Sequence, residues 1–202
     1  LGEDGATHQI LEDLGLMKML PGMTVINTCD YNQTKAATIE IAKHVGPVYL
    51  RFGRPKVPNF TPENQNFIIG KGVKLINGSD VTIVSTGHLV WQSIIAANEL
   101  SHEGIKADVI NIHTIKPLDK QIILDSISKT NCIVSCEEHN IIGGLGESVS
   151  RLIVKNILCP MEFVGVNDTF GESGKPEDLM KKYKLDSENI IKKCKKVISR
   201  KK

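Results

Sequence analysis

The chain has 202 residues and a formal net charge of +2, with 41% hydrophobic and 24% charged residues, which suits a soluble globular protein with a sizeable core. The small net charge and an aromatic content of 4% argue against nucleic acid as a partner, and no apolar run is long enough for a membrane span. The odd number of cysteines, five without a C-x-x-C pair, favours a reduced, cytoplasmic protein.

Residues 1–52 carry the pattern helix, strand, helix, strand. An apolar stripe that includes Leu14 and Met17 predicts the first helix, and Asp30 with Gln33 stands in the positions of a capping box at the start of the second. The predicted elements are a helix over Thr7–Leu20, a strand over Thr24–Asn27, a helix from Asp30 to about His44, and a strand over Val48–Leu50 that ends at Arg51. Both strands are short and apolar, which is typical of a covered, largely parallel sheet.

Residues 53–79 differ in character, because Pro55, Pro58 and Pro62 fall close together among polar residues. This composition predicts a linker over the surface, with one edge strand or hairpin within residues 67–76. From Val81 onward, strands alternate with helices again. The predicted elements are strands over 81–86, 107–112, 132–136 and 163–166, helices over 89–100, 119–128 and 146–157, and two short helices after them.

This alternation predicts an α/β fold with three parts. Residues 80–202 are expected to form a three-layer α/β/α C-terminal domain with a mixed, mostly parallel sheet. Residues 1–52 are expected to form a partial α/β domain, and residues 53–79 to be the linker between the two.

The first candidate site is the stretch Gly2–Gln9, which places two carboxylates, two glycines and a histidine at the start of the first predicted helix. A helix N-terminus presents free N–H groups and the positive end of the helix dipole. Asp4 and His8 could therefore grip a polar sugar there. The alternative is that Asp4 or Thr7 only caps the helix.

The second candidate is Arg51, with Arg54 and Lys56 nearby. Arg51 stands at the carboxyl end of a predicted strand, where open α/β sheets bind ligands. A guanidinium group can donate two parallel hydrogen bonds to a phosphate or carboxylate. A surface salt bridge is the alternative.

The third candidate is Glu137–Glu147, EEHNIIGGLGE, which follows a predicted strand and opens a helix. It matches neither the dinucleotide fingerprint G-x-G-x-x-G nor the zinc motif H-E-x-x-H. Its glycines allow a close approach of the backbone to a ligand or a partner, and we favour a structural or interface role. Metal binding by Glu138 and His139 is the alternative, although neighbouring residues rarely share a metal without further ligands.

The other residues with reactive or titratable side chains carry weaker signals. His88 and His113 stand alone, and we expect surface or core histidines. Ser85 and Ser135 lie within predicted strands with no nucleophile elbow around them. The cysteines are expected to be small buried hydrophobes.

Four stretches in the same order along the chain resemble the transketolase family. The first is close to the family signature G-E-D-G-P-T-H-Q, with Ala6 in place of the proline, which loses some rigidity but no ligand group. The four stretches are Gly2–Gln9 (GEDGATHQ), Thr114–Asp119 (TIKPLD), Glu137–Glu147 and Ser173–Pro176 (SGKP). The resemblance covers essentially the whole chain and identifies it as the end of a pyrimidine-binding domain followed by a C-terminal domain.

The resemblance implies the transfer of a two-carbon ketol unit between ketose and aldose phosphates, with thiamine diphosphate and Mg. It implies that Asp4 contacts substrate hydroxyls, that His8 lines the substrate channel, and that Arg51, or Arg54 as the alternate, holds the sugar phosphate. The Gly-Asp-Gly motif for metal and diphosphate and the glutamate that activates the cofactor are expected upstream of Leu1. We therefore predict no complete catalytic set and no cofactor or metal ligands in this chain.

The chain begins inside the first signature and without methionine, so we expect a fragment that is inactive alone. The missing N-terminal domains would be the rest of one polypeptide or a separate subunit. The full enzyme is expected to be a cytoplasmic homodimer that acts on sugar phosphates in the pentose phosphate pathway. The alternatives are a 1-deoxyxylulose-5-phosphate synthase, a 2-oxoacid dehydrogenase β-subunit, or a non-catalytic dimerisation or regulatory module; TIKPLD and SGKP fit transketolase better than the first two.

Overall fold

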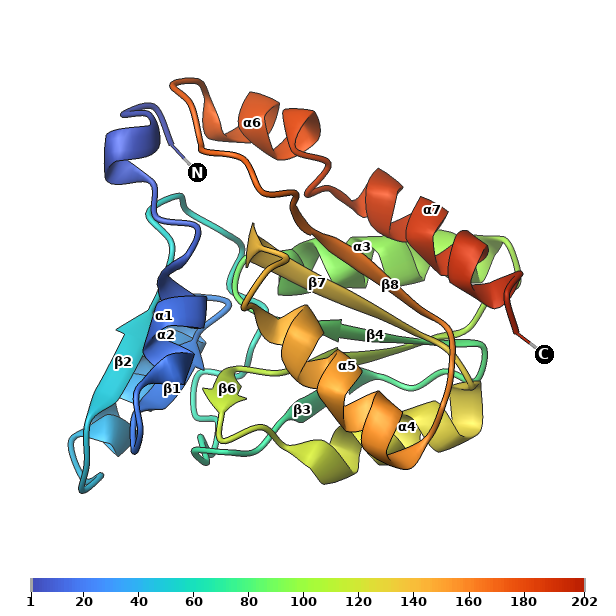
Figure 1. The fold of residues 1–202 in the computed structure, drawn as a ribbon, viewed down its shortest axis with the longest axis horizontal. Helices are drawn as coiled ribbons and strands as arrows, with labels where there is room; N and C mark the ends of the chain where they lie inside the picture. Colours follow the sequence, from blue (N-terminus) through green and yellow to red (C-terminus); the bar gives the residue numbers. More distant parts are fainter. Residues whose placement is uncertain (1, 202) are drawn as a thin grey trace.

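The computed structural model describes residues 2–201 and contains two sheets that stand next to each other (Figure 1). The smaller sheet has the strand order β2-β1-β6, and the larger has the order β3-β5-β4-β7-β8. No helix within residues 2–201 is long and apolar enough to cross a membrane.

The smaller sheet comes mainly from the N-terminal quarter of the chain. β1 and β2 are parallel, with Asn27 opposite Arg51 at their carboxyl ends. The elements of this part are the 3₁₀ helix η1 (Ala6–His8), α1 (Asp13–Met19), β1 (Thr24–Asn27), α2 (Tyr31–Ile41) and β2 (Val48–Arg51). Both predicted strands are present.

The predicted single helix over Thr7–Leu20 is wrong, because the chain leaves the helical conformation at Gln9. The Gln9 side chain donates to the carbonyl oxygens of Gly2 and Glu172. Two residues later, the carbonyl of Leu11 accepts a hydrogen bond from the backbone N–H of Asn140 at 2.8 Å. These tertiary bonds hold residues 9–12 in a non-helical conformation, so helical spacing of apolar residues alone does not produce a helix there.

Asp30 caps α2 as predicted and also anchors the following linker. Its Oδ1 accepts the backbone N–H of Gln33 at 2.8 Å, and its Oδ2 accepts those of Phe60 and Thr61 at 2.9 and 2.8 Å. The Gln33 side chain accepts the N–H of Cys29 rather than that of Asp30, which departs from the usual reciprocal capping box. One buried carboxylate thus ties the linker to the smaller sheet.

The larger sheet has four parallel strands and one antiparallel edge strand, β3. Its strands in spatial order are β3 (Val73–Ile76), β5 (Ala107–Asn111), β4 (Val81–Ser85), β7 (Ile133–Asn140) and β8 (Met161–Val166). Its helices are α3 (Leu89–His102), α4 (Lys120–Thr130), α5 (Leu145–Asn156), α6 (Pro176–Lys182) and α7 (Ser187–Ile198). Side chains of α3 and α7 fill the core on one face, and those of α4 and α5 the core on the other. The predicted α/β/α fold with a mixed sheet is confirmed.

Two segments connect the sheets in ways that the sequence pattern does not show. β6 (Thr114–Lys116), within the TIKPLD stretch, pairs antiparallel with β1. β7 runs on to Asn140 instead of ending at Cys136, so the first residues of the Glu137–Glu147 stretch belong to a strand. The domain boundaries at 52/53 and 79/80 stay a prediction.

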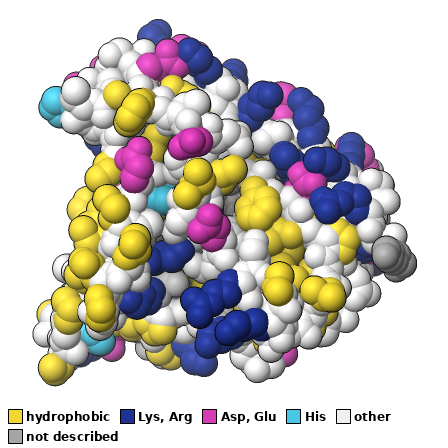
Figure 2. Space-filling view, in the orientation of Figure 1, with side chains coloured by type: hydrophobic (Ala, Val, Ile, Leu, Met, Phe, Trp, Pro, Cys, Tyr) yellow, Lys and Arg dark blue, Asp and Glu magenta, His cyan; other side chains and the backbone are white. Residues whose placement is uncertain are grey.

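Apolar side chains lie exposed on the smaller sheet and its helices. Figure 2 shows hydrophobic side chains along this side of the molecule. The exposed apolar residues here include Leu16, Met19 and Leu20 at the end of α1, Tyr31 and Ile39 on α2, and Val45 after it. Such a surface is typical of one that another part of a protein covers.

Candidate functional site

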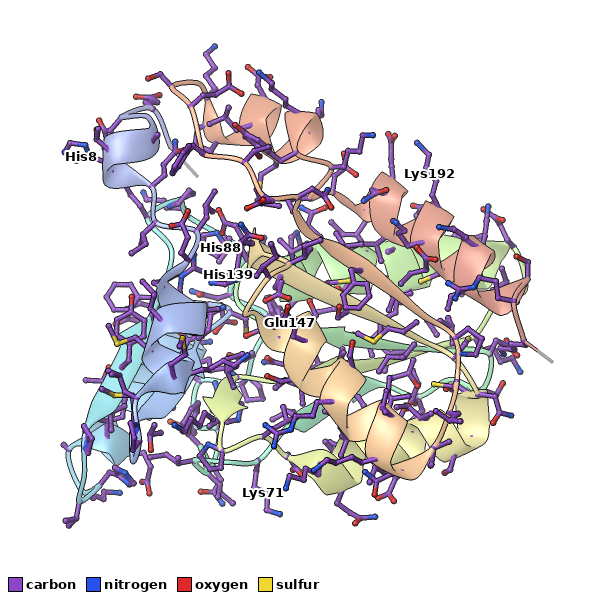
Figure 3. The ribbon with its side chains drawn as sticks, in the orientation of Figure 1. His8, Lys71, His88, His139, Glu147 and Lys192 are labelled. Atoms are coloured by element: carbon purple, nitrogen blue, oxygen red, sulfur yellow. The ribbon has the colours of Figure 1, made fainter. Side chains whose placement is uncertain are left out.

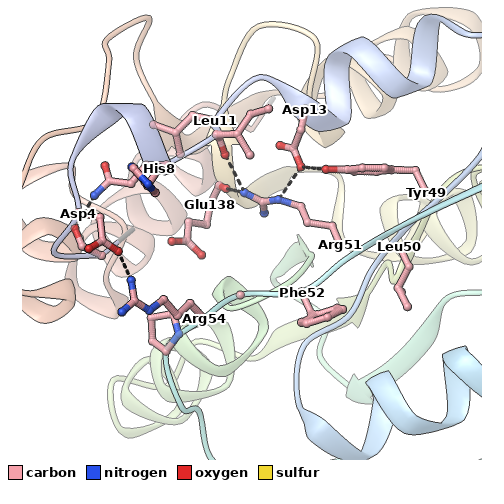
Figure 4. Close-up of a pocket in the computed structure, with 15 residues that line it drawn as sticks. Asp4, His8, Leu11, Asp13, Tyr49, Leu50, Arg51, Phe52, Arg54 and Glu138 are labelled. Carbon is pink, nitrogen blue, oxygen red and sulfur yellow. Dashed lines mark hydrogen bonds and ion pairs between the residues drawn. The ribbon is translucent and has the colours of Figure 1, made fainter.

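A pocket of about 320 Å³ brings the predicted site residues together. In Figure 3, His88 and His139 are labelled near the end of β7, on the side of the larger sheet that faces the smaller one. The lining of the pocket includes Asp4, His8, Arg51 and Arg54 (Figure 4). Asp4 and His8 come from the N-terminal segment, and the arginines come from the end of β2 and the loop after it. The pocket therefore opens at the carboxyl end of the smaller sheet, as expected for α/β folds.

The N-terminal segment is placed by contacts with the C-terminal region. Gly5 has a φ of +81°, a conformation that favours glycine, and a Cβ there would lie 2.7 Å from Ser173 Oγ, so the serine side chain would have to move. Gln9 donates to the Glu172 carbonyl at 3.0 Å. The stretches GEDGATHQ and SGKP, far apart in the sequence, thus pack against each other, and residues of the first stretch line the pocket.

Arg51 is held by a buried acid and by carbonyl groups. Its Nε lies 2.9 Å from Asp13 Oδ2, and the two side chains are 16% and 1% exposed. Its Nη2 donates to the carbonyls of Glu138 at 3.0 Å and Ile10 at 3.3 Å. Tyr49 donates to the same Asp13 oxygen at 2.7 Å, and burial together with this bond raises the pKa of Tyr49 to about 12. Arg51 thus makes a largely buried ion pair rather than a surface one, and it also lines the pocket; its role as a phosphate ligand stays a prediction.

Arg54 is the more exposed of the two arginines. It pairs with Asp4 across the mouth of the pocket, with side chains 74% and 45% exposed. An exposed ion pair of this kind contributes little to stability and exchanges partners easily. His8 is exposed beside it, with Nδ1 2.9 Å from Thr7 Oγ1.

Glu138 and His88 form a buried pair at the inner end of the pocket. His88 Nδ1 lies 3.2 Å from Glu138 Oε2, with side chains 10% and 6% exposed. Burial on its own raises the pKa of Glu138, but the hydrogen bond and charge of His88, with Arg51, bring it down to about 2. Glu138 is therefore a carboxylate. A Cβ at Gly53 would lie 2.0 Å from His88, so the loop after β2 packs directly on this pair.

Sequence reasoning missed the roles of Asp13 and His88. Asp13 belongs to a predicted helix with no motif around it, and His88 was interpreted as a lone surface or core histidine. Their partners lie 38 and 50 positions away, at Arg51 and Glu138. The sequence favours a structural or interface role for the stretch that contains Glu138, with metal binding as the alternative, and no local pattern indicates the ion pair that it makes.

Glu137, next to Glu138 on β7, caps α5. Its two carboxylate oxygens accept the backbone N–H groups of Leu145 at 2.6 Å and Gly146 at 2.8 Å. Burial raises the pKa of Glu137 to about 7, although these bonds and the charge of Lys18 oppose the rise. A carboxyl group at a helix N-terminus meets both free N–H groups and a favourable dipole.

The rest of the Glu137–Glu147 stretch joins α1 to the larger sheet. Lys18 donates to the carbonyls of Gly143 and Gly144 at 2.6 and 2.5 Å. The Gly15 N–H meets His139 Nε2 at 3.3 Å, and a Cβ on Gly143 would lie 3.2 Å from Gly15 Cα. The stretch therefore has a structural role within the chain.

Two family models match the chain. The model of the transketolase C-terminal domain matches residues 70–190, and that of the transketolase pyrimidine-binding domain matches residues 1–59. The chain belongs to the transketolase family. Transketolase-family membership implies dependence on thiamine diphosphate.

Comparison with individual transketolase-family proteins shows what share of their length this chain covers. The chain is 40% identical over 198 residues to a 6-deoxy-6-sulfo-D-fructose transketolase subunit of Clostridium sp. (strain MSTE9), covering 98% of this chain and 62% of the relative. It is 33% identical over 193 residues to a 1-deoxy-D-xylulose-5-phosphate synthase of Caldanaerobacter subterraneus subsp. tengcongensis, covering 94% of this chain and 31% of the relative. A split-gene transketolase, solved as an inactive β4 tetramer, superposes with a TM-score of 0.95 at 39% identity, covering 98% of this chain and 65% of that one. The chain thus spans less than two thirds of these relatives.

Residues 2–201 do not fit the metal ion of the transketolase cofactor. Within residues 2–201 there is no group of three or more His, Cys, Asp or Glu side chains that could hold a metal ion. Mg²⁺ needs oxygen ligands in octahedral geometry. The pocket in this chain instead presents two guanidinium groups, which suit an anion.

Proposed function

We propose that this chain is the C-terminal part of an enzyme that transfers a two-carbon ketol unit from a ketose phosphate to an aldose phosphate. The observation that carries the proposal is the convergence of Asp4, His8, Arg51 and Arg54 on one pocket. A phosphate dianion needs a permanently charged donor, which the two arginines supply. The hydroxyl groups of a sugar need acceptors and donors, which Asp4 and His8 supply.

The two arginines play different parts in this proposal. Arg51 shapes the wall of the pocket and adds positive charge from a fixed position, since Asp13 and two carbonyls hold its guanidinium group. Arg54, exposed and paired only with an exposed carboxylate, makes the direct contact with the phosphate group. The arriving phosphate replaces Asp4 on Arg54, which leaves the Asp4 oxygens free for the sugar hydroxyls.

The active enzyme is proposed to need domains that this chain does not contain. Thiamine diphosphate and Mg are held mainly by those parts, and the exposed apolar surface at Leu16, Met19 and Val45 lies against them or against a second copy. The complete enzyme is a cytoplasmic homodimer of the pentose phosphate pathway. The inactive β4 assembly of the split-gene relative supports the inactivity of such a chain alone.

A ketol-transfer assay on the complete assembly, loaded with thiamine diphosphate and magnesium, tests the proposal. Xylulose 5-phosphate and ribose 5-phosphate are the substrates, and sedoheptulose 7-phosphate is the expected product. Arg54→Ala is expected to raise KM by about tenfold or more, because a charged hydrogen bond contributes roughly 1.5–3 kcal/mol. Arg200→Ala, whose arginine pairs with Glu162 on the larger sheet, serves as the control and leaves KM unchanged.

A 1-deoxyxylulose-5-phosphate synthase is the second candidate, because a protein of that name is 33% identical over nearly the whole chain. The same pocket would then hold the phosphate of glyceraldehyde phosphate, and pyruvate would be the second substrate. The two functions share the phosphate contact, so only the donor distinguishes them. A cofactor-loaded assembly that consumes pyruvate and makes no sedoheptulose 7-phosphate would replace the first proposal with the second.

A further inference from the structure

A second concavity, of about 830 Å³, lies where α1 and β6 meet α4 and α5. Its charged lining residues, which we name the basic groove, are Lys18, Lys116, Lys120, Arg151 and Lys155. Figure 2 shows lysine and arginine side chains gathered in the lower centre of the view, over this part of the molecule. The basic groove shares no lining residue with the sugar-phosphate pocket.

Apolar side chains complete the basic groove. They are Ile115, Leu118, Leu124 and Leu152, and Ser148 and Asn156 add two polar groups. None of the residues that line the groove is Asp or Glu. The volume is within the usual range for sites that hold small molecules.

Two of the five cations are fixed in place by backbone carbonyls. Lys18 donates to Gly143 and Gly144, and Lys116 donates to the carbonyls of Lys18 and Leu20 at 3.0 and 2.6 Å. Burial lowers the pKa of Lys18, and the charges of Glu137 and Glu147 oppose the shift. These bonds orient the two ammonium groups without bringing a carboxylate into the groove.

The other three cations, Lys120, Arg151 and Lys155, are exposed. None of the ion pairs found within residues 2–201 involves them. Arg151 and Lys155 stand one turn apart on the same face of α5, where like charges repel each other. A bound anion would relieve this repulsion.

Other clusters of cations in the chain contain their own carboxylate. Lys193, Lys196 and Arg200 surround Glu162. Lys74 and Lys129 pair with the buried Asp108. The basic groove differs because the counter-charge does not come from the described residues that line it.

We infer that the basic groove binds a small polyanion with two adjacent phosphate groups on an apolar or aromatic body, of which a nucleoside diphosphate is the model. The exposed guanidinium of Arg151 can hold one phosphate through two parallel hydrogen bonds, with Lys120 and Lys155 as further donors. The leucine and isoleucine side chains receive the ring. Such a ligand contacts α1 and β6 on one side and α4 and α5 on the other, so it also joins the two sheets.

Isothermal titration calorimetry on the full-length protein, alone and in the complete assembly, tests this site with ADP, AMP and pyrophosphate as probes. ADP is expected to bind saturably and more tightly than AMP, which has one phosphate group, and than pyrophosphate, which has no ring. The variant Arg151→Gln/Lys155→Gln is expected to weaken ADP binding by about tenfold or more, because it removes two charged donors.

Lys192→Gln is the matched control, since Lys192 is an exposed lysine on α7, away from the groove (Figure 3), and ADP binding is expected to stay unchanged. Arg54→Ala distinguishes the two pockets, and it too should leave ADP binding unchanged. The substituted side chains are exposed, so thermal unfolding should show that the variants fold normally.

Four results would overturn the inference. They are the absence of saturable ADP binding at millimolar concentration, equal losses in the groove variant and the control, a loss confined to Arg54→Ala, and disappearance of binding when the missing domains assemble onto the chain. The last result would show that an acidic surface of another subunit occupies the groove. None of these outcomes depends on ketol transfer, so the inference about the basic groove and the proposed activity are tested independently.

Discussion

The guanidinium group of Arg51 lies 2.9 Å from the carboxylate of Asp13, which is 1% exposed. This pair joins the end of β2 to the first residue of α1, and Tyr49, two residues before Arg51 on β2, donates to the same carboxylate. The wall of the pocket that Asp4, His8 and Arg54 also line is therefore built on a buried ion pair. Removing one partner of a buried ion pair is costly, because the other charge stays buried without a partner.

Asp13→Asn is accordingly expected to destabilise the protein by about 3 kcal/mol, because it leaves the Arg51 charge largely buried and without its acid. Urea unfolding followed by circular dichroism measures the change. Glu40→Gln removes one partner of the exposed Glu40–Lys43 pair and should cost less than about 0.5 kcal/mol. Equal effects of the two substitutions would show that the Asp13 pair is no stronger than a surface contact.

Arg51→Ala and Arg54→Ala are expected to separate stability from binding. The first should lower the free energy of unfolding by about 3 kcal/mol, because Asp13 loses its partner. The second should change it by less than about 0.5 kcal/mol, since its side chain is 74% exposed. Denaturation curves of the two variants give this comparison directly, and a marked loss of stability in Arg54→Ala would argue against its assignment as the displaceable phosphate contact.

Gly144→Ala should be destabilising by about 1–3 kcal/mol through overpacking. A Cβ at this position would lie 2.0 Å from Glu137 Oε2, and that oxygen is held by the N–H of Leu145 at 2.6 Å. Gly2→Ala is the control, because a Cβ there meets nothing within 4 Å. Thermal melting of both variants decides whether the cap of α5 is as tightly packed as the distances indicate.

His113 is expected to make the protein less stable in acid. Its side chain is 1% exposed and its ring centre lies 4.1 Å from that of Phe67; burial lowers its pKa from 6.5 to about 4. The unfolded chain therefore binds a proton at a higher pH than the folded one. The difference in proton binding adds about 3 kcal/mol to the free energy of unfolding above pH 6.5. This stabilisation is lost as the pH falls through about 4.

The difference in unfolding free energy between wild type and His113→Gln, measured by urea titration across pH 4–7, isolates this effect. His139, whose pKa burial also lowers, acts in the same direction in both proteins and cancels from the difference. A difference that does not vary with pH would mean that His113 is protonated in the folded state as readily as in the unfolded chain.

Local sequence patterns predicted the elements whose signals are local. The predicted cap at Asp30 is present, and Asp119, at the start of the helix predicted over 119–128, accepts the N–H of Ile122. The four strands predicted after residue 80 are present, although β7 runs four residues beyond its predicted end. Helix caps depend on residues three positions apart, and strand signals depend on a run of adjacent apolar residues. Both can therefore be recognised in the linear sequence.

The elements that the sequence predicted wrongly or did not indicate share a different cause. The break at Gln9 depends on Glu172 and Asn140, and the short strand β6 exists only because β1 lies beside it. In each case a hydrogen-bond partner more than eighty positions away decides the local conformation. Propensity and periodicity carry no information about such partners.

The sequence by itself determined the family, the α/β/α class and the candidate residues Asp4, His8, Arg51 and Arg54, because these follow from motifs and from local periodicity. Only the tertiary structure decided that these residues share one pocket, that Asp13 holds Arg51, and that His88 pairs with Glu138. It alone shows that five cations from four elements converge on the basic groove. Charge–charge distances are set by how the sheets and helices pack, and packing is a property of the folded chain as a whole.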